Sequence, residues 1–147
     1  MGFDWLVALH LTVLALGTGM SFANWLNWRL ARNMADDEAG SSALARLRLL
    51  TGRVGDVVIA LIWISGIALV MRFTGAEAAN AGALPPAFHA KMLLVVLLTL
   101  FHGISRWAGL RVSRQGRTSL VPVASSAALG AALSAIGSIV LAVASFR

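Results

Sequence analysis

Long hydrophobic runs alternate with short polar segments along the chain. The runs extend over about residues 5–28, 54–71, 88–107 and 119–146. Each is long enough for an α-helix to cross the roughly 30 Å hydrocarbon core of a bilayer. Backbone groups in that core must be hydrogen-bonded within the protein, which helices achieve on their own. The pattern therefore predicts an all-α integral membrane protein, with residues 1–147 forming one four-helix up-and-down bundle.

The polar segments between the runs differ in character. Residues 72–86 are rich in Ala, include Gly and Asn, and end in Pro85-Pro86, a pair that stops a helix from running through. The longer segment, residues 29–53, repeats leucine at Leu44, Leu47 and Leu50 beside several arginines. Its second half suits an amphipathic interfacial helix lying on the membrane surface. Its first half fits a solvated loop equally well.

Charge supports a membrane location and indicates an orientation. Charged residues make up 12% of the chain, about half of the roughly 25% found in soluble domains. The two longer basic segments carry nine arginines, whereas the other side carries Arg72 and Arg147. Because basic residues collect in cytoplasmic loops, we expect a cytoplasmic loop at 29–53 and an N-out/C-out bundle. In a bacterium this means the inner membrane, with lipid as partner. The net charge of +6 could suggest nucleic acid, but the basic residues sit in short segments between the runs, where they set topology, so no nucleic-acid partner is expected.

Small residues recur every fourth position in two of the runs, which lets helix backbones approach closely. We interpret these stripes as packing surfaces within the bundle, with a homo-oligomer interface or the wall of a ligand pocket as the alternative. The stripe in the fourth run comprises Ser126, Gly130, Ser134, Ser138 and Ala142. The stripe in the first run comprises Ala15, Gly19, Ala23 and Asn27.

Ionisable side chains inside the runs are costly in a membrane and therefore mark candidate functional residues. The third run contains His89, Lys91 and His102, and the first contains His10. Lys91 and His102 are eleven residues apart, about three helical turns, and so face nearly the same side, whereas His89 points elsewhere. His10 lies at a depth similar to that of His89 and Lys91, so these three could form one cluster near the outer border.

The combination of histidines and cations favours one class of ligand. Imidazole binds iron and haem and relays protons, while lysine and arginine pair with carboxylates. The absence of cysteine excludes thiolate sites, and a magnesium or calcium site would need several carboxylates. Asp56, the acid at the start of the second run, is expected to pair with nearby Arg53. This set favours a carboxylate-bearing tetrapyrrole over a hydrated metal ion.

Each candidate also has a purely structural explanation. His89 is then an interfacial residue, and Lys91 extends its ammonium group to the membrane surface. His102 is a helix-end histidine in wet surroundings, and His10 is a histidine hydrogen-bonded inside the bundle.

The sequence resembles the HemJ-type protoporphyrinogen IX oxidases, small four-helix membrane proteins of bacteria. The resemblance rests on His89-Ala90-Lys91 at the start of the third run, His102-Gly103 near its end, Leu9-His10 in the first run, and Arg29-Leu30 at its inner end. It implies a haem b in the bundle and oxidation of protoporphyrinogen IX to protoporphyrin IX, with an electron acceptor in the membrane.

The resemblance also implies roles for individual residues. His10 is the first candidate to bind the haem iron and His89 the second, and His89 and His102 are candidates for ligand or proton relay. Lys91 is an essential catalytic cation, and Arg29 handles the substrate propionates. The chain departs from the family after Arg29, where no histidine follows, and before Pro122, where the family's Asn-Glu pair is missing.

Two other classes of function remain open from the sequence. One is a non-catalytic b-type cytochrome or electron-transfer subunit that uses the same histidines. The other is a structural, accessory or copper-handling four-span membrane protein. The lack of cysteine and the scattered positions of the five methionines weigh against copper(I), which prefers soft sulfur ligands.

Overall fold

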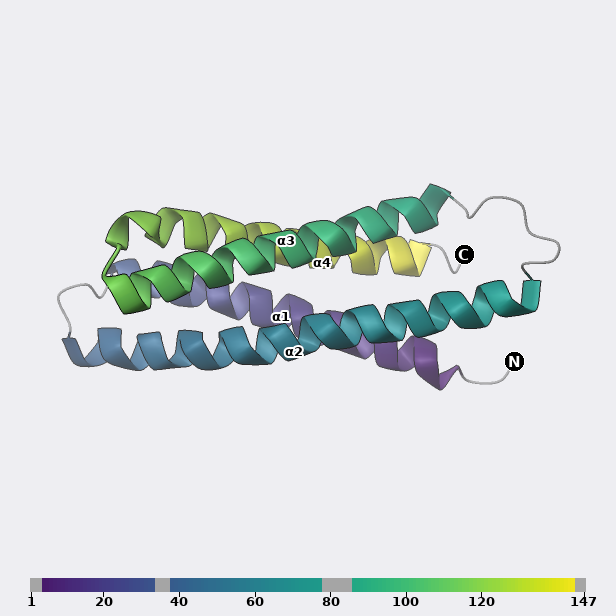
Figure 1. Cartoon of the computed structure of the whole chain (residues 1–147), viewed down its shortest axis with the longest axis horizontal. Helices are drawn as coiled ribbons and strands as arrows, with labels where there is room; N and C mark the ends of the chain where they lie inside the picture. Colours follow the sequence, from purple (N-terminus) through teal and green to yellow (C-terminus); the bar gives the residue numbers. More distant parts are fainter. Residues whose placement is uncertain (1–3, 34–37, 78–85, 145–147) are drawn as a thin grey trace.

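Helices account for nearly all of the chain that the computed structural model describes, which is residues 4–33, 38–77 and 86–144. They are α1 (Trp5–Asn33), α2 (Glu38–Glu77), α3 (Pro86–Gln115) and α4 (Val121–Ala144), with a short 3₁₀ turn, η1 (Thr118–Leu120), before α4. Successive helices run antiparallel (Figure 1). All four are long and apolar enough to cross a membrane. The predicted all-α, four-helix, up-and-down architecture is thereby confirmed.

The two ends of the bundle carry different residues. The starts of α1 and α3 and the ends of α2 and α4 meet at one end (Figure 1), which we call the terminal end. It contains His10, His89 and Lys91. The opposite end, which we call the basic end, contains most of the arginines, including Arg48 and Arg106.

The segment predicted as a cytoplasmic loop at 29–53 is mostly helical. α1 continues to Asn33, and α2 begins at Glu38 and runs without interruption to Glu77. The helix expected near Leu44 is therefore not a separate interfacial helix. It is the first part of α2, which continues directly into the membrane span. The physical reason is composition, because Ala, Leu and Arg favour helix and no proline interrupts them.

Local contacts define where the helices begin and end. At the start of α1, the backbone N–H of Leu6 donates to Oδ1 of Asp4 at 3.1 Å, and the same oxygen lies 3.0 Å from Nη1 of Arg72 on α2. α3 begins at Pro86, the second proline of the pair expected to separate two helices. α3 ends before Gly116, whose φ of 63° is a left-handed conformation that glycine adopts readily at helix ends.

The helices bury two hydrophobic clusters along the bundle axis. The larger one lies at mid-height and draws on all four helices, and the smaller one lies toward the basic end. The larger cluster comprises Val13, Leu14, Val58, Ile62, Val95, Leu98, Ala131 and Ala135. The smaller cluster comprises Trp28, Ala108, Ala124 and Ala128. Many large apolar side chains lie on the outside instead, as expected for helices that contact membrane lipid.

One small-residue stripe packs inside the bundle and the other mostly does not. In α4, Ser134, Ser138 and Ala142 are buried as predicted, although Ser126 is exposed. In α1, the prediction was wrong for most of the stripe, because its first members are exposed and only its last, Asn27, is buried. The buried side of α1 follows a different helical spacing that includes larger residues, namely His10, Val13, Leu14, Gly17, Ser21 and Trp28.

Candidate functional sites at the two ends of the bundle

His10 is buried inside the bundle, three residues before Val13 of the core. Its Nδ1 lies 2.8 Å from the hydroxyl oxygen of Ser65 on α2. The same hydroxyl donates to the carbonyl of Leu61 at 2.6 Å. A serine hydroxyl has one proton, so Ser65 must accept from His10 and the imidazole must carry its proton on Nδ1. Nε2 is then the basic nitrogen of His10.

The other two candidates at the terminal end differ in placement. Lys91 on α3 is half-buried and lies within electrostatic range of His10. His89 is exposed, and its ring contacts Phe88 edge-on at 6.0 Å between centroids. The structure therefore leaves His10 and Lys91 at the same end of the bundle, within electrostatic range of each other, and leaves His89 on the surface of α3.

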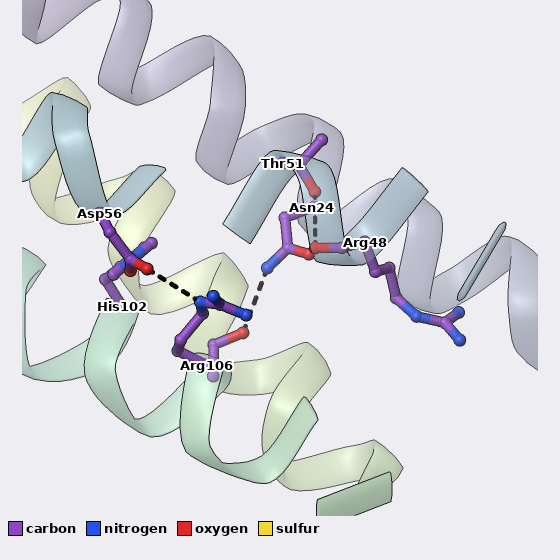
Figure 2. Close-up of polar contacts among 7 residues, drawn as sticks. Asn24, Arg48, Thr51, Asp56, His102 and Arg106 are labelled. Atoms are coloured by element: carbon purple, nitrogen blue, oxygen red, sulfur yellow. Dashed lines mark hydrogen bonds and ion pairs between the residues drawn. The ribbon is translucent and has the colours of Figure 1, made fainter. Parts of the chain in front are cut away.

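His102 belongs to a separate polar cluster, with Asp56 and Arg106, toward the basic end. Its Nε2 lies 2.8 Å from Oδ1 of Asp56, and Nε of Arg106 lies 3.2 Å from Oδ2 of the same carboxylate. Figure 2 shows both α3 side chains turned toward Asp56 on α2. The predicted local pair of Asp56 with Arg53 gives way to these contacts, which bridge two helices.

Two glycines of α2 make room for this cluster. A Cβ atom on Gly55 would lie 2.6 Å from Cε1 of His102, and one on Gly52 would lie 2.8 Å from Nη1 of Arg106. The α3 side chains thus lie directly against the α2 backbone. Any larger residue at either position would have to displace them.

His10 and His102 lie far apart along the bundle axis. His10 contacts Ser65, whereas His102 packs on Gly55. These α2 residues are ten positions apart, which is roughly 15 Å along a helix. Because two axial ligands must reach one iron, His10 and His102 cannot form a ligand pair in this arrangement.

Arg29 lies at the opposite end of the bundle from Lys91. It is exposed near the end of α1, where its guanidinium stacks on Trp25 at 5.5 Å from the ring centroid. It is nineteen residues beyond His10, roughly 28 Å along the helix. The two cations expected to serve one substrate therefore occupy different sites.

Other polar contacts between helices use residues that the sequence analysis did not single out as candidates. Asn24 on α1 donates to Ser105 on α3 at 3.2 Å, and Ser105 donates to the carbonyl of Ala124 on α4 at 2.9 Å. Trp63 on α2 donates through Nε1 to Thr99 on α3 at 3.0 Å. Serine and threonine in helices often bond to their own backbone, so their presence in an apolar run does not identify such partners.

A narrow cleft lies between α2 and α3, with α1 and α4 as its floor. The α2 backbone packs closely on α1 and much less on α3. The polar lining consists of Ser21, Asn24, Arg48, Thr51, His102, Ser105, Arg106 and Ser113. The cleft leaves about 40 Å³ for the centres of water-sized molecules, and one water needs roughly 10–15 Å³ of such space. Its interior suits a compact group rather than a ligand enclosed as a whole.

No three His, Cys, Asp or Glu side chains within the described ranges gather into a site for a bare metal ion. No known family model, curated protein or solved structure matches the chain.

Proposed function

We propose that the protein is a haem b protein of the membrane, in which His10 would hold the haem iron. The observation that carries this proposal is the contact with the Ser65 hydroxyl, which fixes the proton of His10 on Nδ1 and leaves Nε2 as the basic nitrogen that could bind a metal. Metal-binding histidines characteristically donate their second ring nitrogen to a hydrogen-bond partner in this way.

The positions of the three histidines favour a single histidine ligand for the haem iron over a pair of histidine ligands. His89 is exposed, and His102 is held by Asp56 far along the bundle. When bound, haem supplies an iron centre that accepts and donates single electrons. In this proposal His10 holds the iron, and Lys91 pairs with a carboxylate at the same end of the bundle.

The activity that we propose first is oxidation of protoporphyrinogen IX, in keeping with the resemblance to HemJ-type oxidases. Lys91 supports it, because a half-buried ammonium near His10 would attract the propionate of a tetrapyrrole. The electrons must pass to an acceptor in the membrane. The uneven distribution of arginines supports an N-out/C-out orientation in a bacterial inner membrane.

The second candidate is a b-type cytochrome that transfers electrons without acting on a porphyrinogen. The position of Arg29 favours it, because Arg29 and Lys91 lie at opposite ends of the bundle and cannot bind the same substrate together. In this alternative Lys91 would neutralise a propionate of the haem itself.

The deciding experiment is the reduced-minus-oxidised visible spectrum of the purified protein with pyridine haemochrome quantification. We expect about one haem b per chain in the wild type. His10→Ala should lose the Soret band while circular dichroism shows an unchanged helix content, and His89→Ala should keep the band. A protein without haem after reconstitution, or an unchanged spectrum in His10→Ala, would refute the haem proposal.

An activity assay then separates the two candidates. Wild-type protein with haem should convert protoporphyrinogen IX faster than the spontaneous reaction, and Lys91→Ala should remove most of that rate. A haem-loaded protein with no such activity would leave the cytochrome as the function. Full activity in Lys91→Ala would exclude Lys91 from catalysis.

A further inference from the structure

Arg48 on α2 has an unusual environment for an arginine. Its guanidinium lies over the ring of Trp28 on α1, at 4.4 Å from the centroid, and Trp28 is only 2% exposed. Nε and Nη1 of Arg48 are buried, and neither has a hydrogen-bond partner among the described residues. Leaving a buried charged donor unpaired is costly. Arg48 as a whole is only partly buried and lines the cleft, so an acceptor from outside the chain can reach its guanidinium from the cleft side.

The charges around Arg48 leave it uncompensated. Asp56 is the acid closest to the cleft, and its two oxygens contact His102 and Arg106. Figure 2 shows the Arg48 guanidinium pointing away from that cluster. No acidic residue lines the cleft in the part of the chain that the structure describes, whereas Arg48 and Arg106 both do. The mouth of the cleft is therefore cationic.

The depth of Arg48 matches the headgroup layer of a membrane. It lies six residues before Val54, where the charge-poor run of α2 begins, or roughly 9 Å along the helix. Headgroups occupy the layer just outside the hydrocarbon core, and the flexible arginine side chain can reach within it. Basic pockets between transmembrane helices are known binding sites for anionic lipid headgroups.

We infer that the mouth of the cleft between α2 and α3 binds a phosphate-bearing anion through Arg48, at a site separate from that of His10. Guanidinium matches phosphate oxygens with several donors at once, and the small interior of the cleft favours a compact group at its mouth. An anionic phospholipid headgroup or a free phosphate would supply the same chemistry. The site rests on contacts of Arg48 alone and does not depend on haem.

The test uses the full chain in lipid nanodiscs, with native mass spectrometry to count retained lipid. Wild-type protein should retain phosphatidylglycerol over phosphatidylcholine. Arg48→Gln should lose that preference by about tenfold or more, since a hydrogen bond to a charged group contributes roughly 1.5–3 kcal/mol. Arg46→Gln is the matched control, because it removes the same charge from an exposed position two residues away and should keep the preference.

A second variant tests the role of the guanidinium if Arg48→Gln fails to fold, and a second probe distinguishes a lipid headgroup from a free anion. Arg48→Lys retains the charge and should weaken retention several-fold even if Arg48→Gln does not fold. Inorganic phosphate, titrated against the wild type in neutral detergent, tests the free anion. Phosphate binding that requires Arg48, without lipid preference, would assign the site to a soluble anion. Equal retention in wild type, Arg48→Gln and Arg48→Lys, with no phosphate binding, would overturn the inference.

Discussion

Asp56 on α2 and His102 on α3 are 46 residues apart in sequence, and a carboxylate oxygen of one lies 2.8 Å from a ring nitrogen of the other. Arg106 contacts the second oxygen of the same carboxylate at 3.2 Å. One acid thus joins two helices whose backbones are not closely packed on each other. Predictions about this link, and about the contacts near His10, follow from the geometry.

The first prediction concerns the energy of the link itself. Asp56→Ala and Arg106→Ala should each lower the free energy of unfolding by about 1 kcal/mol, because the carboxylate is half-exposed and such pairs are weak when solvated. The double variant should be less destabilised than the sum of the two. Denaturation in detergent, analysed as a double-mutant cycle, measures this coupling, and strictly additive effects would show that the pair does not interact.

The second prediction concerns the α2 glycines. Gly55→Ala should destabilise the protein by about 1–3 kcal/mol, because the new methyl group overlaps the His102 ring and forces it to move. Gly19→Ala is the control, since nothing lies within 4 Å of a Cβ atom there. It should be neutral or stabilise the helix by up to about 1 kcal/mol. Thermal unfolding of both variants measures the contrast, and equal effects would contradict the packing of His102 on Gly55.

The third prediction concerns the serine that contacts His10. Ser65→Ala removes the acceptor for Nδ1 of a buried imidazole and should cost about 1–3 kcal/mol of stability. Under the proposed function, it should also lower haem affinity by about 10- to 100-fold, as loss of a partner of a metal ligand commonly does. Ser126→Ala is the control, because that exposed hydroxyl bonds to its own helix backbone. A stable Ser65→Ala protein with unchanged haem content would exclude an orienting role for Ser65.

The fourth prediction concerns the contact between Trp63 and Thr99. Trp63→Phe removes the indole N–H that donates to Thr99, and Thr99→Val removes the acceptor. Each should lower the free energy of unfolding by about 1 kcal/mol, and the double variant should be little worse than either single one. Trp107→Phe, at an exposed ring on α3, should have no such effect. Chemical denaturation followed by circular dichroism distinguishes these cases.

The helices could be predicted from the sequence because each depends on a long apolar run. The exact bounds could not, since α2 begins at Glu38, well before the apolar run, and continues through a segment whose Ala, Leu and Arg residues favour helix. The pattern of leucines near Leu44 predicted a helix there, but it could not indicate that this helix continues into the membrane span. Such continuity depends on the absence of a break between the polar segment and the apolar run, which the hydrophobic pattern alone does not reveal.

The candidate site was predicted only in part. The sequence placed His10 and Lys91 at a similar depth, and in the structure they lie at the same end of the bundle, within electrostatic range of each other. It could not show that His102 is held by Asp56, because Arg53 was the nearer cation along the chain and the α2–α3 contacts depend on how the helices rotate. The sequence also could not predict the contact between Ser65 and His10, because a serine in an apolar run has no distinctive pattern.

The loose packing between α2 and α3 has a consequence for access. Moving α4 away from α1 or α3 would take apart tightly packed small residues, whereas moving α2 away from α3 would mainly cost the side-chain contacts of Asp56 and Trp63. This seam is thus the easiest place for the bundle to part. In a membrane, parting this seam would open the interior of the bundle toward the surrounding lipid.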